Sequence, residues 1–312
     1  MTPPATPPRT RLPRRRALLA LLALTLATLA PPRTHSQNAT PATPLRIACM
    51  ASVTSNINRD DALASIKVLG RAIAARRQLP LQVESAIYDT VSEVQAGLEK
   101  HAVDLIVMNS AAYLQLAARD ADLDPVFMPG YATPRAREYL LIQPRGTAAS
   151  LADLRGKRIL LLHARGAQLA RPWLDHELRV RGLAPAEKFF ATVQEVSKAT
   201  AALLPVFFGQ ADACVLNRES YELNTELNPQ LGARLQITTN SPSYLESVIC
   251  LRRSYTGQRP ELLAALSEMH QHPDGQQILT LFTITSIIPY HHEALATVRQ
   301  LLPPPTPGPA TP

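Results

Sequence analysis

The sequence Asp104-Leu-Ile-Val-Met-Asn-Ser-Ala-Ala-Tyr113 has a counterpart 108 residues later, Asp212-Ala-Cys-Val-Leu-Asn-Arg-Glu-Ser-Tyr221. In each stretch an apolar run follows the aspartate, an asparagine comes five residues after it, and a tyrosine comes four residues later. Such runs are typical of buried parallel strands, and the asparagine is placed to begin a helix. The repeat predicts two similar α/β lobes in which Asn109 and Asn217 end equivalent strands. Chance similarity between two helix-strand-helix units is the alternative.

Strand and helix patterns alternate before the first copy. Residues 45–51 form an apolar run, and residues 81–87 alternate between apolar and polar side chains. Between them, apolar residues from Ala62 to Ile73 recur at helical spacing. A second helical segment that includes Val94 and Leu98 leads to the strand of the first copy. This β-α-β-α-β order predicts a mostly parallel sheet flanked by helices, with right-handed crossovers.

A second α/β unit begins after a linker at residues 145–150. Its first predicted strand covers residues 158–163, and its last is the second copy of the repeat. Residues 234–238 and 246–251 are predicted to be strands that return the chain to the first lobe. The remainder of the chain shows helical periodicity.

The N-terminal region predicts export. Three arginines at Arg14–Arg16 precede an apolar segment of fourteen residues from Ala17 to Ala30, which is too short to span a bilayer comfortably. Residues 1–36 are therefore predicted to be a signal peptide, cleaved after general secretory or twin-arginine export. The mature protein is expected to be soluble in the periplasm. Residues 37–44 and the Pro/Thr-rich residues 303–312 are expected to be disordered.

The net charge of +7 does not indicate a nucleic-acid-binding protein. Six arginines precede Gln37 with no acidic residue among them, and the rest of the chain carries a formal charge of +1. A nearly neutral mature protein has no global attraction to nucleic acid or to a membrane surface. The six residues are Arg9, Arg11, Arg14, Arg15, Arg16 and Arg33.

Three cysteines, Cys49, Cys214 and Cys250, lie within apolar strand-like runs. An odd number prevents complete pairing in an exported protein. We expect three buried free thiols that act as small hydrophobic residues, with one disulfide as the alternative. Their spacing matches no metal-binding or catalytic motif.

The stretch Leu203-Leu-Pro-Val-Phe-Phe-Gly-Gln-Ala-Asp-Ala-Cys-Val-Leu-Asn217, followed by Glu226-Leu-Asn-Pro-Gln230, resembles a known family. The chain is similar here to the phosphate, phosphite and phosphonate substrate-binding proteins of bacterial ABC transporters, a branch of the type 2 periplasmic binding proteins. Residues 151–158 and 104–113 are further points of similarity. The resemblance covers about residues 45–301, which is the whole expected globular part.

The resemblance implies two α/β lobes joined by two crossover strands, with a ligand bound in the cleft between them. Residues 45–142 and 250–302 would form the first lobe, and residues 143–249 the second. Open and closed forms would differ by a hinge rotation. A cleft at the carboxyl ends of the strands also agrees with the general position of ligands in open α/β sheets.

Strand-to-helix loops present free backbone N–H groups, which suit an anion. Hydroxyl and amide side chains in these loops, two arginines and several tyrosines could complete such a site. For each hydroxyl residue the alternative is a helix cap, and for each tyrosine it is packing in the core or at an interface. The candidate ligand-binding residues are Ser52, Thr54, Tyr88, Asn109, Ser110, Tyr139, Arg165, Gly166, Ser197, Asn217, Arg218 and Tyr244.

The chain departs from the family pattern at Ala164-Arg-Gly-Ala167, where the family usually has a run rich in Ser, Thr and Gly. Two hydroxyl donors are lost and Arg165 appears. Arg165 either clamps a phosphonate or carboxylate in a bidentate manner or points to solvent. If the ligand is an anion, we expect the second lobe to supply most of the positive charge.

Other motifs do not indicate catalysis. His291-His-Glu293 and the pair His270 and His272 suggest a metal, but their place at helix ends favours solvated surface. Gly-rich nucleotide loops, a nucleophile elbow and a zinc-type His-Glu-x-x-His are absent from the sequence. We therefore expect no catalytic residue, no metal and no cofactor.

The leading hypothesis is a monomeric periplasmic binding protein that captures a small oxyanion for an ABC permease and performs no chemistry. A lobe pair that senses a ligand and signals to a membrane kinase or cyclase is the first alternative. A secreted hydrolase is the second.

Overall fold

The computed structural model describes residues 43–54, 57–147 and 150–302. The predicted signal peptide and the tail at residues 303–312 lie outside the described residues. Thr43 and Pro44, assigned from the sequence to a disordered lead-in, instead open the first strand and pair with Leu81 and Gln82. The strand is longer than its apolar run because the neighbouring strand offers backbone partners this far.

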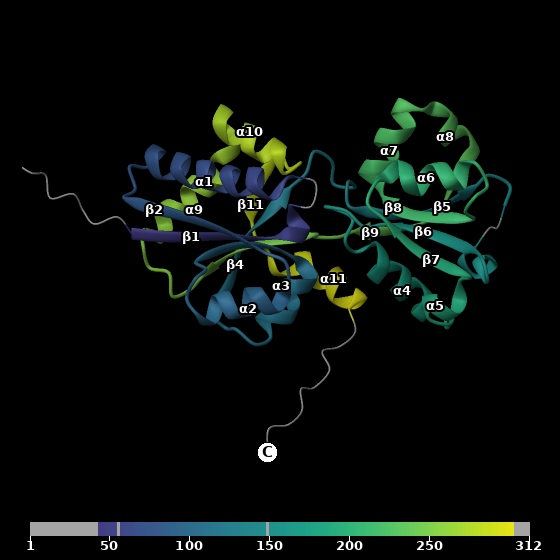
Figure 1. The fold of residues 1–312 in the computed structure, drawn as a ribbon, viewed down its shortest axis with the longest axis horizontal. Coiled ribbons are helices and arrows are strands. Elements are labelled where there is room, and N and C mark those ends of the chain that lie inside the picture. Colours follow the sequence, from purple (N-terminus) through teal and green to yellow (C-terminus); the bar gives the residue numbers. More distant parts are fainter. Residues whose placement is uncertain (1–42, 55–56, 148–149, 303–312) are drawn as a thin grey trace, which may run out of the picture. The chain divides into compact units, whose positions relative to one another are not determined.

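Within the described residues, the first lobe is built on a six-stranded sheet with the order β11-β4-β10-β3-β1-β2 (Figure 1). Strands β1, β2 and β3 run parallel, whereas β10 is antiparallel to both β3 and β4, and β11 is antiparallel to β4. The strands are β1 (Thr43–Met50), β2 (Leu81–Tyr88), β3 (Leu105–Asn109), β4 (Leu123–Gly130), β10 (Ser247–Arg252) and β11 (Ser286–Pro289).

The second lobe has a five-stranded sheet with the order β7-β6-β8-β5-β9 in the part of the chain that is described. Strand β6 is parallel to β7 and β8, whereas β5 is antiparallel to β8 and β9. The strands are β5 (Glu138–Pro144), β6 (Arg158–Leu162), β7 (Thr192–Val196), β8 (Ala213–Asn217) and β9 (Leu235–Ser243).

The prediction of two α/β lobes is confirmed, but the sheets are mixed rather than mostly parallel. The chain crosses to the second sheet between Gly130 and Glu138 and returns between Ser243 and Ser247. The expected boundary after residue 142 therefore falls inside β5. Residues 234–238, expected to return the chain, belong largely to β9 of the second sheet. An apolar run identifies a strand but does not say which sheet will bury it, which explains both differences.

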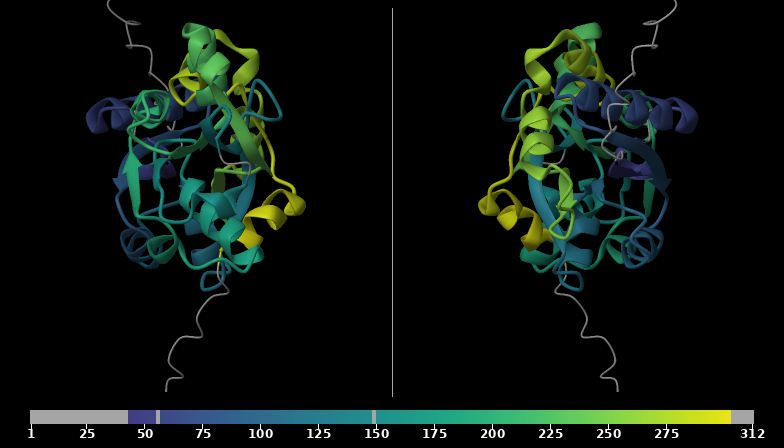
Figure 2. Two further views of the ribbon diagram at one scale, coloured as in Figure 1. Left: turned by 90° about the vertical axis from the view of Figure 1, so that its right-hand side faces the viewer. Right: turned by 90° about the vertical axis from the view of Figure 1, so that its left-hand side faces the viewer.

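Helices cover both faces of each sheet (Figures 1 and 2). On the first sheet α1, α9 and α10 lie on one face, and α2 and α3 lie on the other; on the second sheet α6, α7 and α8 lie opposite α4 and α5. No helix of the described residues is both long and apolar enough to cross a membrane. The helices are α1 (Arg59–Arg76), α2 (Val91–Glu99), α3 (Ser110–Ala117), α4 (Ala170–Val180), α5 (Ala186–Phe189), α6 (Ala199–Phe207), α7 (Arg218–Leu227), α8 (Pro229–Arg234), α9 (Arg259–Ser267), α10 (Pro273–Leu281) and α11 (Ala296–Leu301).

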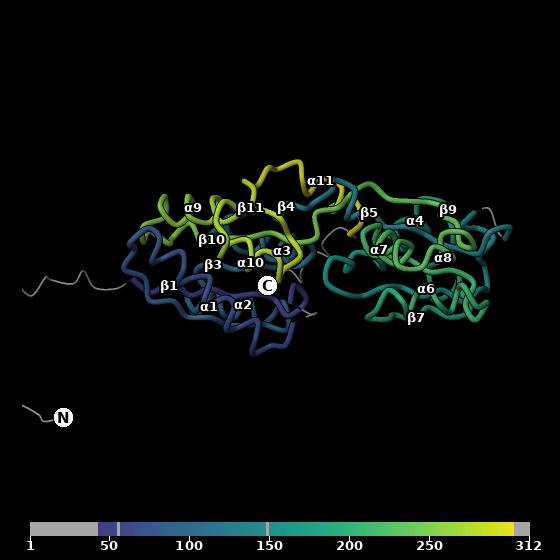
Figure 3. Tube along the Cα trace, turned by 90° about the horizontal axis from the view of Figure 1, so that it is seen from above, coloured from purple at the N-terminus to yellow at the C-terminus, as the bar shows by residue number. Residues whose placement is uncertain are grey.

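The last helix, α11, packs against α3 of the first lobe and α4 of the second. Figure 3 shows α11 where the two lobes meet. Arg179 at the end of α4 donates a hydrogen bond of 3.0 Å to the carbonyl oxygen of Gln300. The lobes are thus connected by this helix as well as by the two crossing segments. Short 3-10 turns complete the fold at η1 (Ala51–Val53), η2 (Leu151–Leu154), η3 (Met269–Gln271) and η4 (His292–Leu295).

Side-chain alternation along the central strands divides the first lobe's core into two layers. In β1, Ile47 and Cys49 belong to the apolar cluster under α1, α9 and α10, whereas Ala48 and Met50 belong to the cluster on the opposite face. All three cysteines are free and buried, which confirms the prediction of buried thiols.

Candidate ligand-binding site

Asn109 and Asn217 hold equivalent positions in the two lobes. Each is the last residue of its strand and the N-cap of the helix that follows, and each Oδ1 accepts a hydrogen bond from the N–H three residues later, at 2.8 Å and 3.1 Å. The Nδ2 of Asn109 donates to the hydroxyl of Ser52 at 3.0 Å, and the Nδ2 of Asn217 donates to the carbonyl of Gly166 at 2.6 Å. Both asparagines therefore cap helices and also fix a neighbouring strand-end loop.

The two loops that these asparagines fix approach each other. The side-chain Nε2 of Gln168 donates a hydrogen bond to the carbonyl oxygen of Ser52. A cavity of about 100 Å³ begins beside this contact. Its polar end is lined by Tyr131, Arg137, Arg165, Gly166, Gln168, Glu246 and Ser247.

Arg137 lies in the segment that crosses from β4 to β5, and its side chain is only 5% exposed. Its guanidinium lies over the ring of Tyr131, 4.2 Å from the centroid, and forms an ion pair with Glu219. Burial opposes the charge, but Tyr131 and Glu219 outweigh it and raise the pKa of Arg137 above its ordinary value. The Nε atom is buried without a hydrogen-bond partner among the described residues. The arginine is therefore a fixed, charged side chain with one unused donor.

Gly166 allows Arg137 to occupy this position. Its φ angle is +70°, a conformation that glycine adopts at little cost. A Cβ atom added there would lie 2.6 Å from an Nη atom of Arg137. Both the backbone conformation and the close contact therefore require glycine.

Glu246 is the buried acid of the site, and it immediately precedes β10. The hydroxyl of Tyr139 donates to its carboxylate, and the N–H of Gln168 donates to it at 3.3 Å. Tyr139 in turn accepts a 2.9 Å hydrogen bond from the N–H of Leu169. Burial raises the pKa of Glu246 above its ordinary value, despite these donors and the nearby charge of Arg137.

Arg165 is half-buried at the same end of the cavity. Its Nη1 donates to the carbonyl oxygen of Leu281 at 2.9 Å, and no ion pair involves it within the described residues. Burial and the positive charge of Arg137 lower the pKa of Arg165 from its ordinary value. An anion placed here would relieve both effects.

Four of the candidate residues lie at or beside this cavity. Arg165 and Gly166 line it, and Ser52 and Asn109 form the contact that adjoins it. Tyr139 is fully buried and reaches the site through its hydroxyl bond to Glu246.

The other candidates have contacts within their own lobes. The hydroxyls of Thr54 and Ser110 donate to the carbonyl oxygens of Ala51 and Leu245, at 3.3 Å and 2.5 Å. Tyr244 is buried with its ring 6.1 Å from that of Tyr139.

Three further candidates belong to other surfaces of the lobes. Arg218 forms ion pairs with Glu138 and Glu222 at 2.8 Å and 3.4 Å. Tyr88 packs on the cluster beneath α2. Ser197 is exposed, and the N-cap of α6 is Lys198, so the expected Ser197 cap is not formed.

Arg137 and Glu246 were not among the residues expected from the sequence, and Gln168 was expected only as the end of the loop at residues 163–168. Arg137 and Glu246 share a signal, because each is a charged residue directly before the first strand that follows a crossing between the sheets. Had the crossings been placed correctly, both residues would have been predicted at the cleft. No sequence pattern predicts the hydrogen bond from the N–H of Gln168 to the carboxylate of Glu246.

The histidines do not form a metal centre in the described part of the chain, where no cluster of three or more His, Cys, Asp or Glu side chains could hold an ion. His291 and His292 are exposed, and Nδ1 of His291 lies 3.6 Å from the carboxylate of Glu293. His270 and His272 are half-buried rather than solvated as expected, because η3 packs against α10.

The stability contributed by Glu246 should depend on pH. Because its folded-state pKa is raised, the folded protein keeps a proton at pH values where the unfolded chain has lost it. Its contribution is therefore complete below the ordinary pKa of 4.5 and is lost as the pH rises through the folded-state pKa. In urea denaturation, the stability of wild type relative to Glu246→Gln should fall as the pH is raised from 4.5 toward 8. Parallel pH profiles would contradict the raised pKa.

Comparison with known proteins gives a family match over most of the chain. The family model for the periplasmic substrate-binding protein of phosphonate ABC transporters matches residues 52–295. No curated protein matches the chain by sequence.

Several solved structures share the fold. XAC2383 from Xanthomonas citri, bound to ATP, aligns with a TM-score of 0.61 at 16% identity and covers 83% of this chain and 96% of that one. PhnD1 from Prochlorococcus marinus, in complex with methylphosphonate, aligns with a TM-score of 0.59 at 14% identity over 83% and 96% of the two chains. A binding-protein component of an ABC phosphonate transporter from Pseudomonas aeruginosa gives 0.57 at 15% identity over 83% and 85%. At these identities the likeness shows the fold alone.

Proposed function

The chain belongs to the family of periplasmic substrate-binding proteins of phosphonate ABC transporters, and we propose that it binds a small phosphonate-like oxyanion at the polar end of its cavity and delivers it to an ABC permease. The observation that carries this proposal is Arg165, a half-buried arginine at the cavity with no ion-pair partner within the described residues. A bound oxyanion would give the guanidinium of Arg165 an ion-pair partner and accept charged hydrogen bonds from it.

Neighbouring groups support an anionic ligand. Arg137 lies at the same end of the cavity with an unused Nε donor, and its charge is retained by Tyr131 and Glu219. The carboxylate of Glu246 already accepts hydrogen bonds from the Tyr139 hydroxyl and the N–H of Gln168. Ser52, from the other lobe, offers a hydroxyl beside the contact with Gln168. Together these groups suit a ligand with several anionic oxygens.

In this proposed role the protein catalyses no reaction and acts as a monomer in the periplasm after removal of residues 1–36. Tyr139 holds Glu246 by a hydrogen bond, and Tyr131 and Glu219 hold Arg137. Their role here is to keep a charged pocket fixed before the ligand arrives, which reduces the cost of ordering it on binding.

A ligand screen tests the proposal. Phosphate, phosphite, methylphosphonate and acetate would be titrated into the exported protein by calorimetry, with thermal melting in parallel. The melting temperature should rise as the concentration of the bound oxyanion rises. At 100 times its Kd, the ligand should add about 2.7 kcal/mol to the free energy of unfolding. Potassium chloride at equal ionic strength is the control. Absence of any shift with all four anions at millimolar concentration would contradict the proposal.

A further inference from the structure

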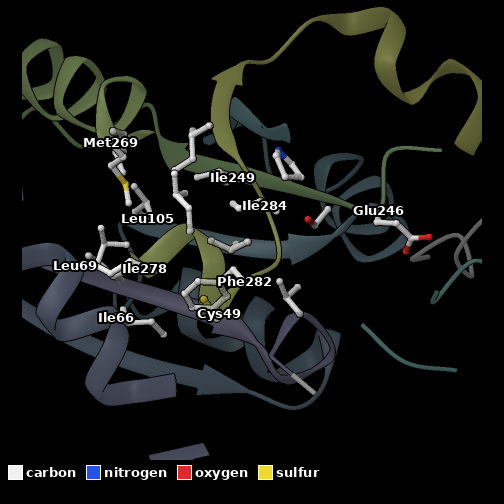
Figure 4. Close-up of a pocket in the computed structure, with 18 of the residues that line it drawn as sticks. Cys49, Ile66, Leu69, Leu105, Glu246, Ile249, Met269, Ile278, Phe282 and Ile284 are labelled. Atoms are coloured by element: carbon white, nitrogen blue, oxygen red, sulfur yellow. The ribbon is translucent and has the colours of Figure 1, made fainter. Parts of the chain in front are cut away.

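The cavity does not end at its charged groups. From Glu246 it continues between the first sheet and helices α1, α9 and α10, and Figure 4 shows Leu69 and Met269 at the opposite end from Glu246. Phe282 and Ile284 lie between these two ends. Apart from the sulfur atoms of Cys49 and Met269, hydrocarbon groups form this part of the wall. The apolar lining comprises Ile47, Cys49, Val53, Ile66, Leu69, Ile73, Leu105, Val107, Pro129, Ile249, Leu262, Leu266, Met269, Ile278, Leu279, Phe282, Ile284 and Ile287.

Val107 shows that this space is a gap in the core. It lies in β3, a central strand of the sheet, and Leu105, two residues earlier on the same face, is buried. Val107 is nevertheless only partly buried, and its side chain lines the cavity. Protein cores are normally packed without such voids, because an empty apolar cavity reduces stability. A cavity that a ligand fills when it binds would recover that loss.

The charge is confined to one end of the cavity. Arg137, Arg165 and Glu246 line it there, whereas the other described residues that line the cavity carry no charge. Cavities lined by Leu, Ile and Phe stay dry and accept hydrocarbon groups. An occupant that satisfies both ends carries an anionic head and an apolar tail.

Building on the proposed function, we infer that the ligand is an organophosphonate whose phosphorus carries an apolar substituent. The phosphonate oxygens lie at Arg165 and Arg137, and the substituent enters the cavity past Val107. The cavity of about 100 Å³ limits its size. An engineered cavity of about 150 Å³ accepts benzene, so this smaller cavity favours a short alkyl chain of about three to four carbons over a phenyl ring.

Calorimetry with a homologous series tests this inference. Affinity should rise by about fourfold for each methylene from methylphosphonate to butylphosphonate, as expected for transfer of a CH₂ group from water into an apolar cavity. Propylphosphonate should bind more tightly than 2-aminoethylphosphonate, which has a chain of the same length but ends in an ammonium group that the cavity cannot solvate.

The two proposals fail in different ways. If methylphosphonate binds and longer chains gain nothing, or if 2-aminoethylphosphonate binds as well as propylphosphonate, the inference about the tail is overturned and the anion site stands. If no phosphonate binds at all, the proposed function fails with it.

Variants at one position locate the tail. Val107→Phe fills the cavity and should bring the ratio of butylphosphonate to methylphosphonate affinity close to one. Val107→Ala widens the cavity and should increase the ratio of phenylphosphonate to methylphosphonate affinity. If Val107→Phe does not fold, Val107→Ala still tests the inference. Val68→Phe, at a 55% exposed position on α1, is the control and should leave both ratios unchanged. Wild-type ratios in both Val107 variants would overturn the inference.

Discussion

Replacing Trp173 with alanine should reduce the free energy of unfolding by about 3 to 5 kcal/mol, the range for removing a large aromatic side chain from a packed core. Trp173 is almost completely buried on α4, and its ring stacks on that of Tyr139 with centroids 6.1 Å apart. Its Nε1 has no hydrogen-bond partner among the described residues, so the loss comes from packing rather than from a broken hydrogen bond. Urea denaturation measures the change.

Phe208→Ala is the matched control, because this aromatic residue of the same lobe is 66% exposed. It should change the unfolding free energy by less than about 0.5 kcal/mol. Equal effects of the two substitutions would show that Trp173 does not fill the core of the second lobe. The Trp173 variant should also loosen Tyr139, which holds the carboxylate of Glu246 in the site.

Arg165→Ala should weaken oxyanion binding by about 10- to 100-fold, the equivalent of one hydrogen bond to a charged group. The change removes the charge at the cavity that has no ion-pair partner in the described part of the chain, together with one hydrogen bond to the carbonyl oxygen of Leu281. Calorimetry with methylphosphonate gives the ratio of dissociation constants, and thermal melting without ligand shows whether the fold is kept.

Arg145→Ala provides the control for this experiment. Arg145 also donates one hydrogen bond to a backbone carbonyl, that of Gly232 at 3.0 Å, but it does not line the cavity. It should leave the dissociation constant unchanged. If Arg165→Ala binds methylphosphonate as tightly as wild type, then Arg165 points to solvent when ligand is bound, which was the alternative from the sequence.

Much of the fold could be predicted because the spacing of apolar residues in the sequence reflects which side chains are buried. The apolar runs at β3 and β8, with an asparagine after each, correctly indicate strands that end in helix caps. Strand direction and sheet membership could not be obtained in this way. The run at β5 is as apolar as those of β3 and β8, and only its pairing with β8 and β9 places it in the second sheet.

The residues that line the cavity could be predicted only in part, for a related reason. Strand-end loops with polar side chains are visible in the sequence, and Arg165 stands out within Ala164–Ala167 as a departure from the family pattern. The positions of Arg137 and Glu246 depend on where the chain crosses between sheets, which periodicity does not determine. The apolar end of the cavity could not be predicted either, because Val107 and Ile249 look like ordinary core residues.

The three buried thiols can report how often each lobe opens. Burial raises the pKa of Cys49 to about 12 and also raises those of Cys214 and Cys250, so the folded protein holds almost no reactive thiolate at neutral pH. An alkylating reagent can therefore react only after the surrounding strands separate. Cys214 lies in the second sheet, and Cys49 and Cys250 lie in the first. The alkylation rate of each cysteine consequently measures the opening of its own lobe, and no probe residue has to be introduced.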